Sequence, residues 1–177
     1  IKAMWITMAL WCNMKVRFIM IHNHHKAKFI VFEGIDGSGK SSQYELLRKY
    51  LASRSSIEAV YPKEPDKNRP VGGEIYRILN GSHPNYKLNK MRPYHMQAFY
   101  IEDRMFNYRE NIIPALQRGA HVVQDRGAVS SICYGAQKPD EFYDLIGLHD
   151  RVFSAAQVPF IWPDLILIFD IPVDLAV

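Results

Sequence analysis

The stretch FIVFEGIDGSGKSSQ, residues 29–43, places a loop rich in glycine and serine directly after a run of apolar β-formers. The loop runs from Gly34 to Ser41 and satisfies the pattern G-x-x-x-x-G-K-[ST]. Glycines let backbone N–H groups close around a polyphosphate, and the positive end of a following helix points at the same charge. A chance glycine turn also matches the pattern, but the apolar run before it and the helical pattern after it favour a phosphate-binding loop, or P-loop.

Two side chains of this loop carry the predicted chemistry. Lys40 supplies a mobile cation for the β- and γ-phosphates of a nucleotide, and the Ser41 hydroxyl is a ligand for Mg²⁺. The residues predicted to bind the nucleotide phosphates are Gly34, Asp36, Gly37, Ser38, Gly39, Lys40, Ser41 and Ser42.

Composition and charge indicate a globular domain with an anionic ligand. The chain has 177 residues, 48% of them hydrophobic and 23% charged, which suits one domain with its own core. A net charge of +4 fits a phosphate ligand, but many proteins are this basic, so a nucleic-acid partner is not favoured. Cys12 and Cys133 are too few for a disulfide framework, which indicates a reducing, cytoplasmic setting.

The first 27 residues differ from the rest, and we expect them to be a leader outside the domain, with Met20 as a candidate start. The apolar segment from residue 3 to 14 is too short to span a bilayer, which needs about 20 residues. His22, His24 and His25 form a cluster, but without a fourth ligand nearby a solvated tail is favoured over a metal site.

Hydrophobic patterning predicts strands that alternate with helices. The expected strands are residues 28–33, 57–61, 121–124 and 165–169, and the expected helices are residues 41–52, 71–79, 91–108, 110–117 and 140–156. Strands separated by helical crossovers imply a parallel sheet covered on both faces, so we expect an α/β domain from residue 28 to 177. The last residues, IPVDLAV, have the pattern of a helix that has just begun, and we expect the domain to continue beyond them.

A P-loop protein also needs a carboxylate at the end of a second strand to manage magnesium. Asp125 follows the strand HVVQ, and Asp170 follows LILIF. Asp125 is favoured as the metal ligand because Arg126 comes next and can reach the same phosphates, although a surface ion pair is the alternative interpretation. We predict Lys40, Asp125 and Arg126 as the catalytic residues and leave Asp170 as structural.

Five ordered motifs resemble thymidylate kinase, a nucleoside monophosphate kinase. They are FIVFEGIDGSGKSSQ, KEPDKNRPVGGEIYRILNG, FYIEDR, IIPALQRGAHVVQDRGAVSSICYG and PDLILIFDIPVDLA. The resemblance implies a three-layer P-loop NTPase fold with five parallel strands, four of which are present here, and a homodimer. It implies transfer of the γ-phosphoryl group of ATP to dTMP, and it puts the lid and the last strand after residue 177. The chain itself is therefore expected to be weakly active.

The same resemblance assigns a set of residues to dTMP. Asp36 would hold the sugar 3′-hydroxyl, Lys63 the monophosphate, and Arg104 a base carbonyl, while Tyr100 would stack on the base and Tyr134 would exclude ribonucleotides. The residues implied to bind dTMP are Asp36, Lys63, Tyr100, Arg104, Arg126, Ser131 and Tyr134. Without the resemblance, Tyr100 is more often a core residue and Arg104 a solvated helix charge.

Some positions depart from the family pattern. Lys63 stands where arginine is usual and loses its two-bonded grip on phosphate, a loss that Arg69 could offset. Gly127 replaces a tyrosine and is expected to leave one wall of the acceptor site open, and Gly135 replaces a glutamine. Glu33 fits a buried cap as well as a catalytic role. A kinase for another deoxynucleoside or deoxynucleotide, and a non-catalytic nucleotide-binding paralogue, therefore remain alternatives.

Overall fold

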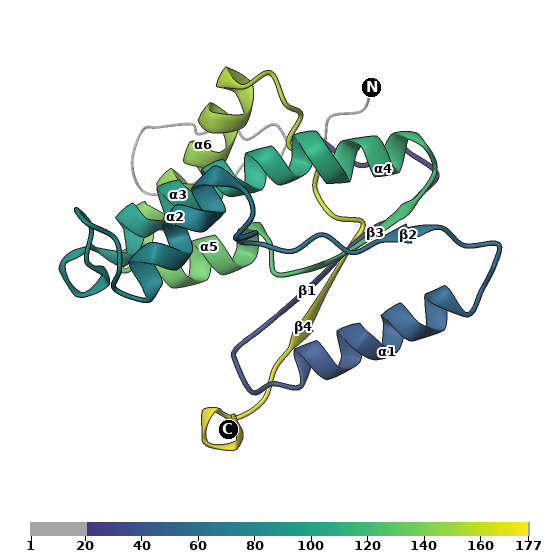
Figure 1. Cartoon of the computed structure of the whole chain (residues 1–177), viewed down its shortest axis with the longest axis horizontal. Coiled ribbons are helices and arrows are strands. Elements are labelled where there is room, and N and C mark those ends of the chain that lie inside the picture. Colours follow the sequence, from purple (N-terminus) through teal and green to yellow (C-terminus); the bar gives the residue numbers. More distant parts are fainter. Residues whose placement is uncertain (1–20, 177) are drawn as a thin grey trace.

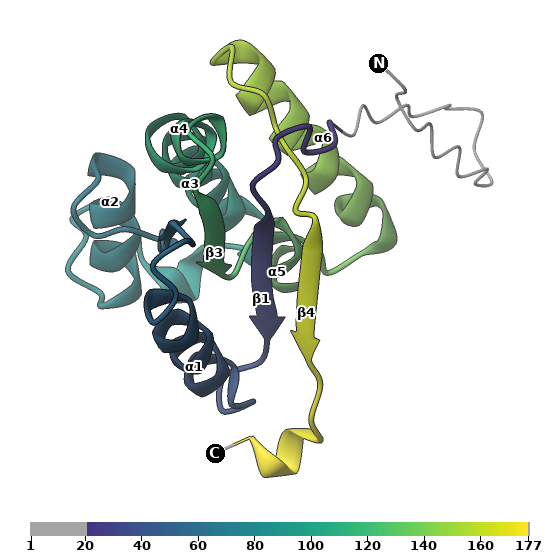
Figure 2. The same ribbon diagram turned by 90° about the vertical axis from the view of Figure 1, so that its right-hand side faces the viewer.

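The structure is a computed structural model that describes residues 21–176, so the predicted leader up to Met20 lies outside the described residues. A four-stranded parallel sheet has the order β2-β3-β1-β4. Its strands are β1 (Phe29–Gly34), β2 (Ala59–Val60), β3 (His121–Asp125) and β4 (Leu165–Phe169). The predicted α/β class with four parallel strands is confirmed, and Figure 2 shows β1, β3 and β4 running in the same direction.

Helices cover both faces of the sheet. The helix α1 lies on one face, and α3, α4, α5 and α6 lie on the other (Figure 1). The α-helices are α1 (Lys40–Ala52), α2 (Pro70–Leu79), α3 (Pro93–Asn107), α4 (Ile113–Gln117), α5 (Ala128–Gly135) and α6 (Pro139–Ala155). Short turns of helix are η1 (Leu88–Lys90), the π-helical η2 (Tyr108–Ile112) that joins α3 to α4, and η3 (Val173–Leu175). The periodicity did not predict α5.

The core lies between the sheet and the α3–α6 layer. Phe29 and Val31 of β1 pack with Ile101 of α3, Leu145 of α6 and other fully buried apolar side chains. Burial of this kind is worth roughly 1.5–3 kcal/mol for each large side chain. Because β1 and β3 are parallel neighbours, their carboxyl ends meet at one edge of the sheet. This register brings the P-loop and the end of β3 together, which is where ligands bind in open α/β sheets.

The described residues before the first strand contact the rest of the structure. Ile21 forms a parallel bridge with Ile161, the Asn23 amide donates to Asp164, and Ala27 is buried in the core. The predicted boundary between residues 27 and 28 therefore falls inside a packed region. No helix within residues 21–176 combines the length and the apolar character that a membrane crossing needs.

Candidate active site

The P-loop forms a small polar pocket at the carboxyl end of β1. Gly34 and Gly39 adopt positive φ angles of 151° and 81°, and Gly39 is the residue that caps α1. A Cβ at Gly34 would lie 2.8 Å from the carbonyl oxygen of Phe169, so only glycine fits there. Residues 35–42 line this phosphate-loop pocket of about 380 Å³. Backbone N–H groups and the start of α1 make it suited to an anion.

Lys40 and Asp125 form an ion pair beside this pocket. The Lys40 Nζ lies 2.9 Å from Asp125 Oδ1 and is almost completely buried. The same Oδ1 atom makes no contact of hydrogen-bond geometry within residues 21–176, so it is held by charge alone. The pair places one cation and one carboxylate together, as phosphoryl transfer requires.

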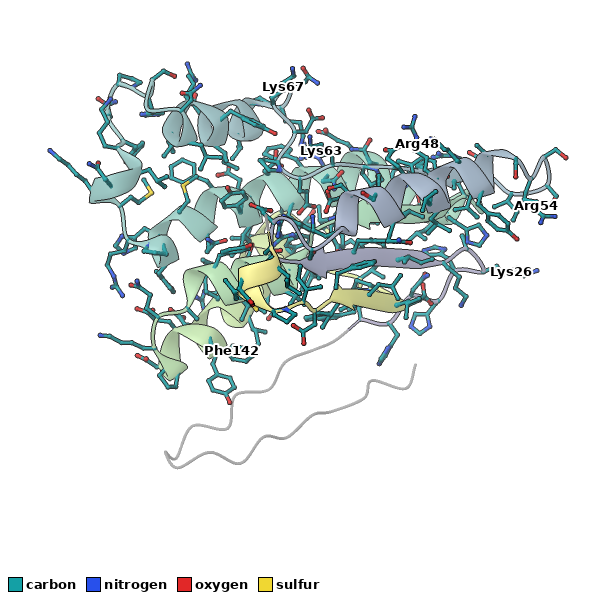
Figure 3. All side chains as sticks on the ribbon, turned by 90° about the horizontal axis from the view of Figure 1, so that it is seen from below. Lys26, Arg48, Arg54, Lys63, Lys67 and Phe142 are labelled. Atoms are coloured by element: carbon teal, nitrogen blue, oxygen red, sulfur yellow. The ribbon has the colours of Figure 1, made fainter. Side chains whose placement is uncertain are left out.

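A neighbouring cavity of about 430 Å³ contains the predicted magnesium ligands. Ser41 and Asp125 line it together with Lys63, Arg48 and Tyr44. Figure 3 labels Lys63 and Arg48 on the same side of the molecule. Burial, reinforced by the charge of Asp125, raises the pKa of Tyr44 to about 12. Hydroxyl and carboxylate oxygens suit Mg²⁺, which takes few protein ligands and keeps waters and phosphates. Within residues 21–176 no group of three metal-ligating side chains occurs.

Arg126 connects the P-loop to α5. Its guanidinium donates to the carbonyl oxygen of Gly34 at 3.0 Å and pairs with the Asp36 carboxylate, and it reaches the Tyr134 hydroxyl at 3.4 Å. Its backbone adopts φ 65°, a left-handed conformation that is uncommon for residues other than glycine. Gln124 holds this turn by donating to the Arg126 carbonyl oxygen at 2.7 Å. An uncommon backbone conformation that neighbouring groups hold in place is typical of functional sites.

A second, larger pocket adjoins the P-loop. We call this space of about 530 Å³ the apolar pocket. Its apolar wall residues are Pro65, Leu79, Leu88, Met91, Pro93, Met96 and Tyr100. Its polar lining residues are Asp36, Glu64, Gln97, Arg104, Arg126, Ser130, Ser131 and Tyr134. Asp36 lines both this pocket and the phosphate-loop pocket, so the two pockets are neighbours that share this residue.

Arg104 is buried at the floor of the apolar pocket, with only 2% of its surface exposed. Its guanidinium pairs with Glu64 at 2.8 Å and donates to Ser131 Oγ at 3.0 Å and to the Gly127 carbonyl oxygen at 2.9 Å. A fourth contact joins Nη1 to His149 Nε2 at 2.7 Å. The alternative of a solvated helix charge does not apply, because partners from four segments fix this side chain.

The partners of Arg104 are themselves buried. His149 Nδ1 lies 2.8 Å from the Leu145 carbonyl oxygen, so the proton sits on Nδ1 and Nε2 accepts from Arg104. Burial, helped by the Arg104 charge, lowers the pKa of His149 to about 3. Burial also raises the pKa of Glu64, against the opposing effects of Arg104 and Asn107. The floor is thus a network with one neutral histidine and one arginine–glutamate pair.

Glu33 caps α5, as one of its two interpretations proposed. Its carboxylate accepts from the Gly127 N–H at 2.9 Å and from the Ser130 hydroxyl at 2.6 Å. A Cβ at Gly127 would lie 3.2 Å from Val31 Cγ1 and 3.6 Å from Glu33 Oε1, both on β1. Gly127 is not among the residues that line the apolar pocket, and its expected effect on one wall of the acceptor site stays a prediction.

Most of the predicted residues gather around the two pockets. Asp36, Tyr100, Arg104, Arg126, Ser131 and Tyr134 line the apolar pocket, whereas Lys63 lines the cavity of Ser41 and Asp125 instead. Arg69 does not face the apolar pocket: it pairs with Asp103 at 2.9 Å and donates to the Lys63 carbonyl oxygen at 3.2 Å. The suggestion that Arg69 offsets the loss at Lys63 is therefore not supported.

Sequence reasoning missed several residues of the apolar pocket and its floor, among them the polar residues Gln97, Glu64 and His149. Gln97 had a usable signal, since it precedes Tyr100 by three residues and Arg104 by seven on one helix, and such residues share a face. Glu64 and His149 carried no such signal, because their partner Arg104 is 40 and 45 residues away along the chain.

Comparison with known sequences identifies the family of this chain. A sequence profile of the family described as Thymidylate kinase matches residues 32–177. The chain belongs to the thymidylate kinase family. A thymidylate kinase from Kosmotoga olearia is 39% identical over 149 residues, which cover 84% of this chain and 66% of that protein. A thymidylate kinase from Francisella tularensis subsp. novicida is 32% identical over 147 residues, which cover 82% and 66%.

A solved thymidylate kinase structure supports the same assignment. The crystal structure of the enzyme from Ehrlichia chaffeensis superposes with a TM-score of 0.66 at 27% identity, covering 84% of this chain and 74% of that one. The thymidylate kinase fold seen here is therefore shared at the level of both sequence and structure. The chain spans slightly less than two thirds of the length of the two curated thymidylate kinases.

Proposed function

We propose that this protein phosphorylates dTMP to dTDP with ATP as the phosphoryl donor. The observation that carries the proposal is that two unlike pockets lie next to each other and share Asp36. One is polar and lined by the P-loop, and the other has apolar walls and a floor of fixed hydrogen-bonding groups. Two nucleotides bound in them would meet end to end, which is the arrangement that transfer between phosphates needs.

The donor side binds the ATP phosphates through residues 34–42. Lys40 neutralises charge on the β- and γ-phosphates, and Arg126 stabilises the phosphates from the β3 side. The Ser41 hydroxyl and the Asp125 carboxylate would hold Mg²⁺, which supplies further charge neutralisation when bound. The buried Asp125 Oδ1, which has only the Lys40 ammonium group beside it among the described residues, fits a cation ligand.

The acceptor side orients dTMP in the apolar pocket. Tyr100 stacks on the base, Arg104 and Ser131 hydrogen-bond its edge, and Tyr134 packs against the sugar at C2′. Asp36 holds the 3′-hydroxyl at the junction of the pockets. Lys63, which lies beside Ser41 and Asp125, would act on the monophosphate from that cavity. Catalysis on this proposal is positioning and charge neutralisation, with no covalent intermediate.

The proposal includes the setting of the enzyme. We propose a cytoplasmic homodimer in which residues 28–177 belong to the kinase domain. Analytical ultracentrifugation of the natively expressed protein tests the dimer, and a monomer at micromolar concentration would contradict it.

The function is tested by binding and turnover together. Calorimetric titration of this chain with dTMP and with Mg·ATP is expected to give two independent sites. The natively expressed protein is expected to form equal amounts of dTDP and ADP, followed by ³¹P NMR. Absence of a dTMP site in the chain, or ATP hydrolysis without dTDP formation by the natively expressed protein, would overturn the proposal.

A further inference from the structure

Gln97 shares the pocket-facing side of α3 with Tyr100 and Arg104. The three residues follow the spacing i, i+3, i+7 on this helix, and all three line the apolar pocket. Only 5% of the surface of Gln97 is exposed, which is unusual for a glutamine and needs a reason. Neither the ion pairs nor the helix contacts described above use its side chain.

The amide of Gln97 has a defined orientation. Its Nε2 donates to the Pro93 carbonyl oxygen at 3.3 Å. Because a carbonyl oxygen only accepts hydrogen bonds, the nitrogen of the amide and not its oxygen faces Pro93. The Oε1 atom accepts no hydrogen bond from any residue in the described part of the chain. Within residues 21–176, the buried side-chain polar atoms that have no hydrogen-bond partner are Ser38 Oγ and Asp125 Oδ1. Gln97 Oε1 is not one of them. The amide oxygen therefore faces the pocket as a free acceptor.

Gly135 makes room for this side chain. A Cβ at position 135 would lie 2.4 Å from Gln97 Cγ and 2.8 Å from Leu145 Cδ1, so any larger residue would displace the glutamine. Gly135 lies one helical turn after Ser131 on α5. Because Arg104 contacts Ser131 while Gln97 meets position 135, these two residues of α3 face two successive turns of α5.

The unused hydrogen-bonding groups of this floor form a pattern. Four of the five N–H groups of Arg104 contact Glu64, Ser131, His149 and Gly127. The fifth, on Nη2, has no protein partner among the described residues. The Ser131 oxygen accepts from Arg104, so its own O–H remains to donate. The floor thus offers donors from Arg104 and Ser131 and one acceptor from Gln97.

We infer that Gln97 is a specificity-determining residue that selects a base with an imide edge. Thymine and uracil present a carbonyl, an N3–H and a second carbonyl, so the N3–H donates to Gln97 Oε1 while one flanking carbonyl accepts from the neighbouring donors of Arg104 and Ser131. Cytosine has a bare acceptor at N3 and an amino group in place of one carbonyl, so two contacts become mismatched. This inference rests on the proposed function, because it assumes that the apolar pocket holds the acceptor base.

Replacing the amide without changing the shape tests the inference. Gln97→Met removes the acceptor from an unbranched side chain of similar length. Calorimetric affinities for dTMP and dCMP are expected to converge, with dTMP binding weakened about tenfold to hundredfold because N3–H loses its partner, and dCMP binding little changed. Gln97→Glu keeps an acceptor oxygen and is expected to retain the preference for dTMP. The exposed Gln117→Leu on α4 is the matched control and is expected to leave both affinities unchanged.

The outcomes separate this inference from the proposed function. If the unaltered protein binds no dTMP, the proposed function fails. If it prefers dTMP and Gln97→Met keeps the full preference, the inference about Gln97 is overturned while the function stands. A measurement on the unaltered protein needs no folded variant: N3-methyl-dTMP, which lacks the N–H, is expected to bind at least about tenfold more weakly than dTMP. Equal affinity for the two nucleotides would also overturn the inference.

Discussion

The phosphate-loop pocket is lined by one continuous segment, residues 35–42, whereas the apolar pocket takes its lining from the P-loop, α2, η1, α3, α5 and the loops after β2 and β3. Asp36 at the first is 94% exposed in its side chain, and Arg104 at the floor of the second is almost fully enclosed. The first pocket therefore depends on backbone conformation, and the second depends on long-range side-chain contacts. Damage to the first is expected to change binding, and damage to the second is expected to change folding as well.

The largest expected effect is on the floor of the apolar pocket. Glu64→Ala leaves the buried Arg104 without its carboxylate partner. Breaking a buried ion pair in this way costs about 3–5 kcal/mol of unfolding free energy. Urea denaturation followed by circular dichroism measures the change. A loss below about 1 kcal/mol would mean that the network does not stabilise the fold.

The next effect is expected at the phosphate loop. Lys40→Ala removes the cation beside Asp125, and phosphoryl transfer by the natively expressed protein is expected to fall about 10²- to 10³-fold. Its melting temperature should fall less than that of Glu64→Ala, because the Asp125 side chain that loses its partner is 27% exposed, and this would distinguish the two pockets. The exposed Lys49→Ala on the same helix is the control. Turnover that survives Lys40→Ala would contradict the role of the P-loop.

A smaller effect concerns pH. His149 is neutral when folded, with a pKa of about 3, whereas the unfolded chain binds a proton near pH 6.5. Its contribution to stability is therefore complete above pH 6.5 and is lost as pH falls toward 3. At pH 5 the loss is about 2 kcal/mol. Unfolding titrations at pH 7 and pH 5 should show a shallower pH dependence in His149→Phe, while the exposed His95→Gln should match the unaltered protein. Equal slopes in all three proteins would contradict a buried neutral histidine.

The smallest effect is expected at the surface. Glu58→Ala removes an ion pair with Arg118 in which both side chains are about half exposed. Such pairs contribute at most about 1 kcal/mol. The same urea titration that measures Glu64→Ala measures this variant, and the difference between the two isolates the effect of burial. A loss as large as that of Glu64→Ala would contradict the comparison between the two regions.

The sequence predicted the donor side better than the acceptor side. The P-loop is a local pattern, and the carboxylate of Asp125 follows from the end of one strand, so short-range rules suffice for both. The four strands and their parallel arrangement also follow from local hydrophobic patterns. The helix α5 was missed because its N-terminus is capped by Glu33, a residue 94 positions before the capped Gly127.

The acceptor side depends on contacts that no local pattern carries. Arg104 alone resembles an ordinary surface charge on a helix, and only its contacts with Glu64, Ser131 and His149 make it a fixed floor. Tyr100 and Tyr134 were found through the family resemblance. Lys63 was assigned to the monophosphate through the same resemblance, and because it lines the cavity of Ser41 and Asp125, its role stays a prediction.

The capping of α5 by Glu33 has a consequence for how this protein can vary. Glu33 directly precedes the P-loop, and it holds the helix that carries Ser131 and Tyr134. A displacement of β1 is therefore expected to shift the P-loop and α5 together. Substitutions in this strand that change the binding of one substrate are expected to change the binding of the other, so we expect changes in acceptor choice to arise on α3, whose described residues make no hydrogen bond to Glu33.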